Sequence, residues 1–543
     1  MAIFILMIEI SKKSRLLLSL ISGLLMAISF PFSGSLTLAV FVSWVPLLLI
    51  EDYIFTKRYR SRKVFYNAYL AFFIYNITTT WWVWNASGGG AALAIILNSL
   101  LMAIAFQLFH FTKKHIGKKE GYISLFIYWI AFEYFHYNWE MSWTWLSLGN
   151  TFSITPSWVQ WYSYTGVLGG TFWILLVNLV VFKIYKNVLF KKETWRIQTP
   201  LIWSAAFLFI LPLSISLVTY FSYTEKINPI EVIAVQPNID PYNEKFVLGG
   251  EIKQLEKITR LAKSKITKST DLIVAPETAM SYGFTENSVR NEAGFNFLVD
   301  FQQKTNNIPW CIGASTWKTF QKKNSRASRE IMNSNGFYES YNTAVAINQS
   351  NQPGFIHKSK LVPGVEVIPF SDILPFLEDL SIQNGGTSGT LGIEEEPLTF
   401  VYEEFQLAPV ICYESIYGEW VAQQCRKGAN LIAIITNDGW WKDTPGYKQH
   451  VSFASLRAIE NRRSIVRSAN TGTSCFVNQR GDILQATKWW EEDVIRGTLN
   501  LNNEQTFYTL YGDVMGRSFA FVAVLLIIFT FVKRFKKKHE ATK

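Results

Sequence analysis

Long apolar runs recur through the first 220 residues, and they constrain the fold more than any other feature of this 543-residue chain. Several approach the ~20 residues that an α-helix needs to cross the hydrocarbon core of a bilayer. One more run lies near the C-terminus, so we predict about eight transmembrane helices. The predicted spans are Leu16–Phe30, Leu36–Ile50, Val64–Trp84, Ala91–Phe111, Ile123–Tyr137, Val167–Tyr185, Ile202–Phe221 and Phe519–Val532.

Basic residues gather in every second connection between these runs. Short connections rich in Lys and Arg stay on the cytoplasmic side of a membrane. The alternate connections, such as residues 31–35 and 85–90, contain neither residue type. We therefore predict that both termini are cytoplasmic and that the stretch between the seventh and eighth runs faces outward. The basic groups are Lys12, Lys13 and Arg15; Lys57 to Lys63; Lys113 to Lys119; Lys183 to Lys192; and Lys533 to Lys538.

The formal charge of +11 reflects this topology and does not indicate a nucleic-acid partner. Proteins that bind nucleic acids usually have a basic stripe interleaved with aromatic residues, which is absent from this sequence. The four cysteines form no C-x-x-C pair and the six histidines no H-E-x-x-H motif, so we expect no zinc site, no disulfide framework and no cofactor.

The stretch from about residue 228 to 508 has no comparable apolar run and is predicted to be a soluble domain. Its apolar runs are short, β-branched and bounded by turn residues, which is typical of buried strands. Helical patterns lie between them, so we predict an α/β domain with an αββα sandwich. We expect a membrane domain over residues 1–227, a soluble domain over 228–508 and a last helix with a basic tail over 509–543. The predicted strands are Ile230–Val235, Leu272–Ala275, Trp310–Gly313, Ala344–Ile347, Leu407–Cys412 and Leu431–Ile435, and the helices are Lys253–Lys263 and Gln449–Asn461.

Glu277 follows the first of three strand ends that bear reactive side chains. It comes directly after Pro276, which stops a buried strand. A carboxylate at the end of an apolar strand can act as a general base when its surroundings raise its pKa. Taken alone, a single Glu in this position is more often a turn or helix-capping residue.

Lys358 follows a second strand-like segment, and Glu366 lies eight positions further along. A lysine close to a substrate carbonyl could stabilise the oxyanion of a tetrahedral intermediate. A lysine considered alone is more often a solvated surface charge.

Cys412 ends a third apolar strand and is followed by Tyr413 and Glu414. Most free cysteines are small core residues. A thiol at a strand end, in a domain that also has a strand-end carboxylate and ammonium group, fits an activated nucleophile.

Glu277, Lys358 and Cys412, in this order, resemble the Glu-Lys-Cys triad of the nitrilase, or carbon–nitrogen hydrolase, superfamily. Together with the helical bundle, the chain resembles the apolipoprotein N-acyltransferase family over nearly its full length. The matching segments are Gln236-x-Asn238-Ile239, Pro276-Glu277-Thr278, Lys358-x-x-Leu361-Val362-Pro363, Cys412-Tyr413-Glu414, Thr436 to Trp441, Arg457 to Arg463, Arg467 to Gly472 and Tyr511-Gly512-Asp513.

This resemblance implies an integral enzyme of the bacterial inner membrane with a periplasmic catalytic domain. It implies transfer of a fatty acyl chain from a membrane phospholipid, through a thioester on Cys412, to the N-terminal amine of S-diacylglyceryl lipoproteins. Glu277 would accept the proton and Lys358 would stabilise the oxyanion, with Glu366, Tyr413 and Glu414 as auxiliary residues. We expect a monomer that acts in the bilayer.

Two segments depart from the family pattern. The family often has Pro-Phe-Gly-Glu where this chain has Pro363-Gly364-Val365-Glu366, so the turn before the acid differs. An aromatic residue that contacts substrate in some members has only Phe246 as its counterpart here.

Two other functions stay open from the sequence. One is a membrane-tethered amidase or nitrilase that hydrolyses a small C–N substrate, with water taking the thioester. The other is a transporter or scaffold without enzymatic activity. We expect few buried charges in the bundle, which disfavours a transport path.

Overall fold

The computed structural model describes residues 10–247, 249–348, 353–371 and 390–540. It contains two compact units, which we call the helical unit and the sheet unit. The helical unit comprises Met1–Trp84, Gly88–Phe221 and Asp513–Lys543, and the sheet unit comprises Asn85–Ser87 and Ser222–Gly512. The domain boundaries that we predicted after residues 227 and 508 stay a prediction.

The helical unit is built from long helices that pack through aromatic and small apolar side chains. Trp44, Phe72 and Trp129 meet in its interior, with ring centroids 4.4 to 5.6 Å apart. Its helices are α1 (Lys12–Ser29), α2 (Val45–Thr56), α3 (Arg62–Thr80), α4 (Gly88–His115), α5 (Lys118–His136), α6 (Tyr162–Phe190), α7 (Thr199–Ser222) and α13 (Val514–Glu540). Short 3₁₀ helices join them: η2 (Thr37–Phe41), η3 (Trp81–Asn85), η4 (Thr144–Leu146), η5 (Leu148–Ile154) and η6 (Pro156–Trp158).

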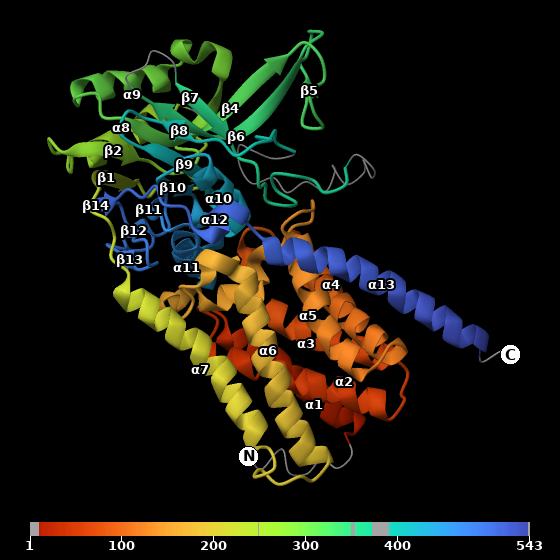
Figure 1. Ribbon diagram of the computed structural model, residues 1–543. Helices are drawn as coiled ribbons and strands as arrows, with labels where there is room; N and C mark the ends of the chain where they lie inside the picture. The colour runs from red at the N-terminus through yellow and green to blue at the C-terminus, as the bar shows by residue number, and fades with distance from the viewer. Residues whose placement is uncertain (1–9, 248, 349–352, 372–389, 541–543) are drawn as a thin grey trace. The chain divides into compact units, whose positions relative to one another are not determined.

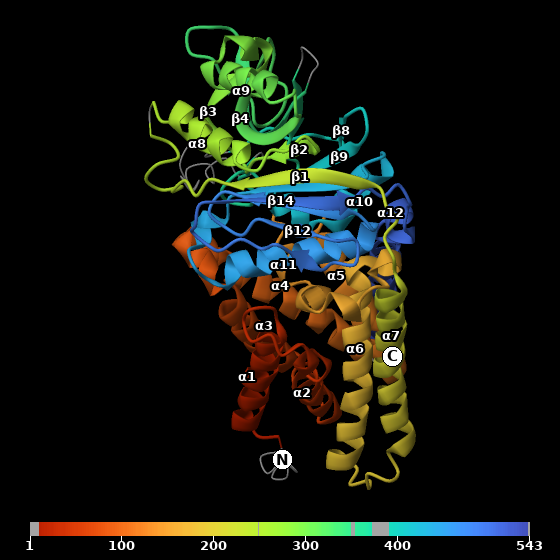
Figure 2. The same cartoon turned by 90° about the vertical axis from the view of Figure 1, so that its left-hand side faces the viewer.

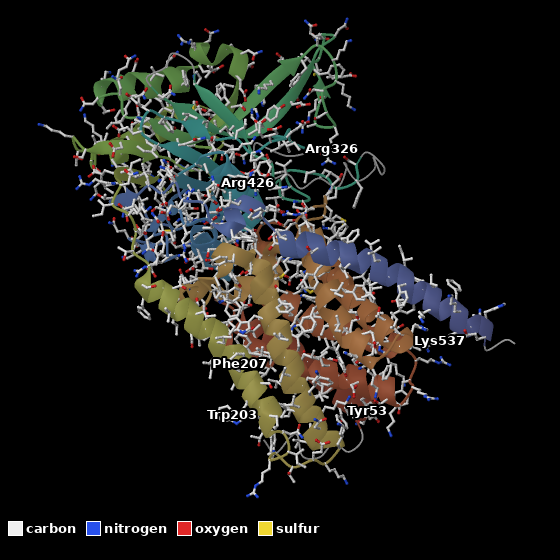
Figure 3. The ribbon with its side chains drawn as sticks, in the orientation of Figure 1. Tyr53, Trp203, Phe207, Arg326, Arg426 and Lys537 are labelled. Carbon is white, nitrogen blue, oxygen red and sulfur yellow. The ribbon has the colours of Figure 1, made fainter. Side chains whose placement is uncertain are left out.

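Five helical segments in the described part of the chain are long and apolar enough to cross a membrane. They are Thr37–Thr56, Gly88–His115, Tyr162–Phe190, Thr199–Ser222 and Val514–Glu540. Large apolar side chains on α7 point outward, as Figure 3 shows for Trp203 and Phe207, which are 71% and 60% exposed. Such faces are stable against lipid and costly against water.

The other three predicted spans also form helices, namely α1, α3 and α5, but these are shorter or more polar. α1 has only 18 residues and begins with three basic residues within its first turn. α3 contains two Asn and three Thr, and α5 begins Lys-Lys-Glu. These three helices are long enough to be candidate spans but more polar than the five, so the count of about eight transmembrane helices stays a prediction.

Our expectation of few buried charges in the bundle was wrong. Asp52 on α2 accepts from Lys186 of α6 at 2.8 Å and from Lys113 of α4 at 3.1 Å. Glu51 pairs with Lys113 and His110, and the lysine and both acids are almost fully buried. Because each acid has a basic partner, these charges cross-link α2, α4 and α6.

The sheet unit contains two mixed sheets. Within the described residues, the larger sheet has the strand order β14-β1-β2-β4-β6-β5, with β3 beside β4 and β7 beside β6. The pairs β1–β2, β2–β4 and β3–β4 are parallel and the rest are antiparallel. Its strands are β1 (Pro229–Gln236), β2 (Thr270–Val274), β3 (Met280–Thr285), β4 (Trp310–Phe320), β5 (Arg329–Glu330), β6 (Phe337–Ile347), β7 (Gly354–His357) and β14 (Asp493–Asn500). Figure 2 shows β1 and β14 side by side.

The smaller sheet has the order β13-β12-β11-β10-β9-β8 in the described residues, with β9, β10 and β11 parallel. Its strands are β8 (Phe400–Val401), β9 (Gln406–Ile411), β10 (Leu431–Thr436), β11 (Ser464–Ala469), β12 (Cys475–Val477) and β13 (Ile483–Leu484). The helices of the unit are α8 (Glu251–Lys263), α9 (Ala293–Lys304), α10 (Gly418–Arg426), α11 (Pro445–Asn461) and α12 (Phe507–Tyr511), with η7 (Glu286–Asn291), η9 (Cys412–Ile416) and η10 (Asp438–Trp441).

The two sheets pack face to face, and helices cover their outer faces (Figure 1). One buried cluster joins Val232 and Leu272 of the larger sheet to Leu407 and Leu431 of the smaller one. A second cluster packs α8 and α9 on the larger sheet, and a third packs α10 and α11 on the smaller sheet. This confirms the predicted αββα sandwich.

Candidate active site

The three strand-end residues lie together in the sheet unit. Glu277 comes shortly after β2, Lys358 directly after β7 and Cys412 directly after β9. Their exposed fractions are 6%, 1% and 9%, so all three are shielded from water. Glu277 and Lys358 both act electrostatically on the Cys412 thiol. Two sheets thus bring a carboxylate, an ammonium group and a thiol into one buried cluster.

Lys358 is held between two carboxylates. Its Nζ lies 2.8 Å from Glu366 Oε1 and 3.3 Å from Glu277 Oε1. Burial lowers the pKa of Lys358, but the charges of Glu366 and Glu277 outweigh this effect and raise it well above the usual lysine range. The amine is therefore a permanent cation at this site.

Asn342 of β6 connects the same two carboxylates. Its Nδ2 donates to Glu277 Oε1 at 2.8 Å and to Glu366 Oε1 at 3.2 Å. The Asn342 backbone carbonyl oxygen accepts a hydrogen bond from the Lys358 backbone N–H at 2.8 Å. Through its side chain, Asn342 holds the two carboxylates close to each other. Through its backbone, it holds the segment that presents Lys358 beside β6.

The backbone around Glu277 is tightly enclosed. The Asn437 N–H donates to Glu277 Oε2 at 2.9 Å, and the buried Lys245 Nζ donates to the Glu277 carbonyl oxygen at 2.9 Å. Gly313 of β4 faces this backbone, and a Cβ at position 313 would lie 2.5 Å from the Glu277 Cα. Any residue larger than glycine at position 313 would displace Glu277.

Cys412 adopts a left-handed backbone conformation, with φ of +52°. This conformation is unfavourable for a non-glycine residue and turns the chain sharply from β9 into η9. Burial, followed by the charge of Glu277, raises the pKa of the Cys412 thiol well above its usual value, although Lys358 lowers it. The resting thiol is therefore protonated, and its activation requires a base.

Glu414 ties together the two segments that present Lys358 and Cys412. Its Oε1 accepts from the backbone N–H groups of Ser359 at 2.6 Å and Lys360 at 3.3 Å, and its Oε2 accepts from that of Ile411 at 2.8 Å. Burial raises the pKa of Glu414 to about 7, against the opposing effect of these hydrogen bonds. Tyr413 is buried and stacks edge-on against Tyr417 at 5.4 Å.

A second polar network supports the backbone of Cys412. His450 Nε2 lies 3.1 Å from the Cys412 carbonyl oxygen, and His450 Nδ1 lies 2.9 Å from Asp438 Oδ1. Asp438 also pairs with Arg467 at 2.6 Å. Although burial raises the pKa of Asp438, Arg467 and His450 hold it far below its usual range. The network fixes the turn on which the thiol sits.

The remaining predicted site residues lie close to this cluster. Glu366 belongs to this cluster although the turn before it differs from the family pattern. Its Oε2 accepts a hydrogen bond from the Val362 backbone N–H at 2.8 Å, which holds the carboxylate in place. Phe246 is half-buried, and its ring centroid lies 6.0 Å from Lys245 Nζ. Cys311, Cys425 and Cys475 are fully buried, and burial raises their pKa to about 12, 11 and 11.

Sequence reasoning missed Lys245, Asn342 and His450 as members of this site. Each is a single polar residue without a local pattern that sets it apart. A sequence signal was available only for Asp438 and Arg467, which lie in segments that match the family without an assigned role.

Comparison with known proteins covers both units. Residues 232–508 match the family model Carbon-nitrogen hydrolase, and residues 22–180 match the model Apolipoprotein N-acyltransferase N-terminal domain. An apolipoprotein N-acyltransferase of Chlorobaculum tepidum is 28% identical over 95% of this chain and 96% of its own length. One of Geobacter metallireducens is 26% identical over 96% of each chain. The crystal structure of Saccharomyces cerevisiae Nit3, a member of branch 10 of the nitrilase superfamily, aligns with 54% of this chain and 99% of its own at 17% identity and a TM-score of 0.36.

Proposed function

This chain belongs to the carbon–nitrogen hydrolase family, and we propose that it transfers a fatty acyl chain from a membrane phospholipid to the N-terminal amine of lipoproteins. The observation that carries the proposal is the buried cluster of Glu277, Lys358 and Cys412. In the sequence, the unit that contains this cluster lies between two apolar helices, α7 and α13, which are long enough to cross a membrane. The relatives matched over nearly their full length are named apolipoprotein N-acyltransferases, which supports acyl transfer to a lipoprotein nitrogen.

In the first half-reaction, Glu277 takes the thiol proton and Cys412 Sγ attacks the ester carbonyl carbon of the phospholipid. The carbonyl oxygen becomes an oxyanion, which Lys358 and the Tyr413 backbone N–H stabilise. When the intermediate collapses, the C–O ester bond breaks and the leaving alkoxide takes the proton from Glu277. A lysophospholipid departs, and the acyl chain stays on Cys412 as a thioester.

In the second half-reaction, the α-amine of the S-diacylglyceryl cysteine attacks the thioester carbonyl. Glu277 accepts a proton from the amine, the C–S bond breaks and the thiolate is protonated again. The products are an amide-linked lipoprotein and the free enzyme, so the kinetics are ping-pong. The reaction needs no metal or organic cofactor.

The auxiliary residues have separate roles in this scheme. Glu366 keeps the Lys358 ammonium oriented, since its carboxylate lies closer to the amine than that of Glu277 does. Glu414 keeps Lys358 and Cys412 in register. Phe246 provides an apolar contact for the substrate at the edge of the cluster.

The proposal includes a topology of about eight transmembrane helices in the bacterial inner membrane. The termini are cytoplasmic, the catalytic domain is periplasmic and the protein acts as a monomer. The basic loops support this orientation, because they alternate with loops that contain no basic residue. Attachment of the catalytic domain to membrane helices keeps the thiol near the insoluble donor, which removes much of the entropic cost of their encounter.

Intact-mass analysis tests the donor step. We expect the chain extracted from its native membrane to bear an adduct of fatty-acyl mass that neutral hydroxylamine removes. The adduct should be absent from Cys412→Ala and present in Cys425→Ala, a matched control with a buried core thiol. Purified enzyme supplied with labelled phospholipid should release lysophospholipid. A chain that stays unmodified and instead hydrolyses small amides would be an amidase, and a chain with neither activity would be a binding protein.

A further inference from the structure

Lys245 is a second buried lysine beside the proposed catalytic groups. It lies in the segment between β1 and α8 and is 2% exposed. Its Nζ donates to the Glu277 carbonyl oxygen at 2.9 Å. The charges of Glu277 and Cys412 both act on it. A lysine without carboxylate contact is rarely buried, so its position needs an explanation.

The segment around Lys245 is built to hold this side chain in place. The Lys245 backbone N–H donates to the Asp240 carbonyl oxygen at 3.0 Å. Gln254 of α8 donates to the carbonyl oxygens of Glu244 and Lys245, each at 3.1 Å. The ammonium group is therefore fixed against the Glu277 backbone.

Lys245 balances the charge of the cluster formed by Glu277, Glu366 and Lys358. Glu277 and Glu366 contribute two negative charges, and Lys358 contributes one positive charge. Asp438, the other acid that acts on the thiol, has Arg467 as its counterion at 2.6 Å. With a protonated Lys245 the group is neutral, and it stays neutral when the proton moves from Cys412 to Glu277. Without Lys245, a thiolate would have to form in a buried group of net negative charge, which is unfavourable.

We propose that Lys245 is a positioning residue of the acyl transfer, which holds the Glu277 backbone and supplies the positive charge that allows the Cys412 thiolate to form. The inference rests on the proposed role of Cys412 as the nucleophile. Burial lowers the pKa of Lys245 to about 8, while Glu277 and Cys412 oppose this shift. The amine is therefore mostly protonated at neutral pH.

The test is the pH dependence of Cys412 alkylation by iodoacetamide in the full-length, detergent-solubilised chain without lipid. Mass spectrometry of the Cys412 peptide gives the rate from pH 6 to 10. Lys245→Gln keeps a donor for the Glu277 carbonyl but removes the charge, and Lys245→Arg keeps the charge. Lys253→Met, at an exposed position on α8, is the control.

Below pH 8, where Lys245 is charged in the wild type, we expect Lys245→Gln to lower the alkylation rate about tenfold, and this difference should shrink as the pH rises toward 10. Lys245→Arg and Lys253→Met should stay close to the wild type. If Lys245→Gln does not fold, Lys245→Met provides the same comparison. A wild-type alkylation rate below pH 8 in both uncharged variants would overturn the inference while leaving the proposed function intact. A wild-type Cys412 that neither forms the acyl adduct nor reacts with iodoacetamide would overturn both.

Discussion

Replacement of Glu414 tests how strongly one buried carboxylate holds the site together. The Glu414 carboxylate accepts hydrogen bonds from three backbone N–H groups, those of Ser359, Lys360 and Ile411, at 2.6, 3.3 and 2.8 Å. In Glu414→Gln the side-chain amide nitrogen replaces one acceptor, so at least one buried donor loses its partner. Such a donor costs about 1–3 kcal/mol. In Glu414→Ala all three donors lose their partner, and we expect a cost of about 5 kcal/mol.

The assay combines thermal unfolding with the rate of acyl-adduct formation in detergent. For a unit of this size, a cost of about 2 kcal/mol corresponds to a Tm lower by about 3 °C for Glu414→Gln. The hydrogen bonds also join the Lys358 segment to the Cys412 strand, so a shift of about 1 Å should slow thioester formation about 100-fold. Glu404→Gln, at an exposed position before β9, is the control. If Glu414→Gln matched this control in both Tm and rate, the cross-linking role of Glu414 would be refuted.

Three more predictions concern the neighbouring groups. Asn342→Ala removes a hydrogen-bond donor shared by Glu277 and Glu366 and should slow thioester formation about tenfold, as measured by intact mass over time. Asn342→Asp should slow it further, because it adds a third negative charge beside the two carboxylates. Asp438→Asn leaves the buried Arg467 without its counterion and should cost about 3–5 kcal/mol, seen as a lower Tm; an unchanged Tm would contradict the pairing. His357 is buried, which lowers its pKa, but hydrogen bonds to Glu286 and Glu394 raise the pKa overall. Its stabilising effect is therefore complete below the unfolded value of about 6.5 and is lost as the pH rises through the folded value, so the Tm difference between wild type and His357→Gln should be larger at pH 6 than at pH 9.

Sequence patterns predicted strands well where apolar residues form the whole strand. The predicted strands Ile230–Val235 and Leu431–Ile435 lie within β1 and β10, and each predicted end differs from the observed end by no more than one residue. The pattern failed for β4 and β6, which continue to Phe320 and back to Phe337 through polar residues. There the antiparallel backbone ladder stabilises the strands regardless of side-chain polarity, so hydrophobic pattern does not mark their ends.

The candidate site was predictable in part for a related reason. Glu277, Lys358 and Cys412 each follow an apolar strand, and that position made them visible in the sequence. Lys245 and Asn342 have no such marker, because their role depends on contacts across more than 30 residues of chain and on burial. Only the folded chain shows that a single Lys and a single Asn belong to the same charge network.

Gly313 on β4 and Glu277 after β2 constrain each other, although they are distant in the sequence. Gly313 has no functional group, yet the backbone that presents Glu277 has no room to retreat toward it. The reach of the base toward the thiol therefore depends on the length of its own side chain and not on adjustment of the backbone. A lineage that acquired a side chain at position 313 would lose the position of its base without any change to a reacting group, so selection on the base extends to a strand that takes no part in the chemistry.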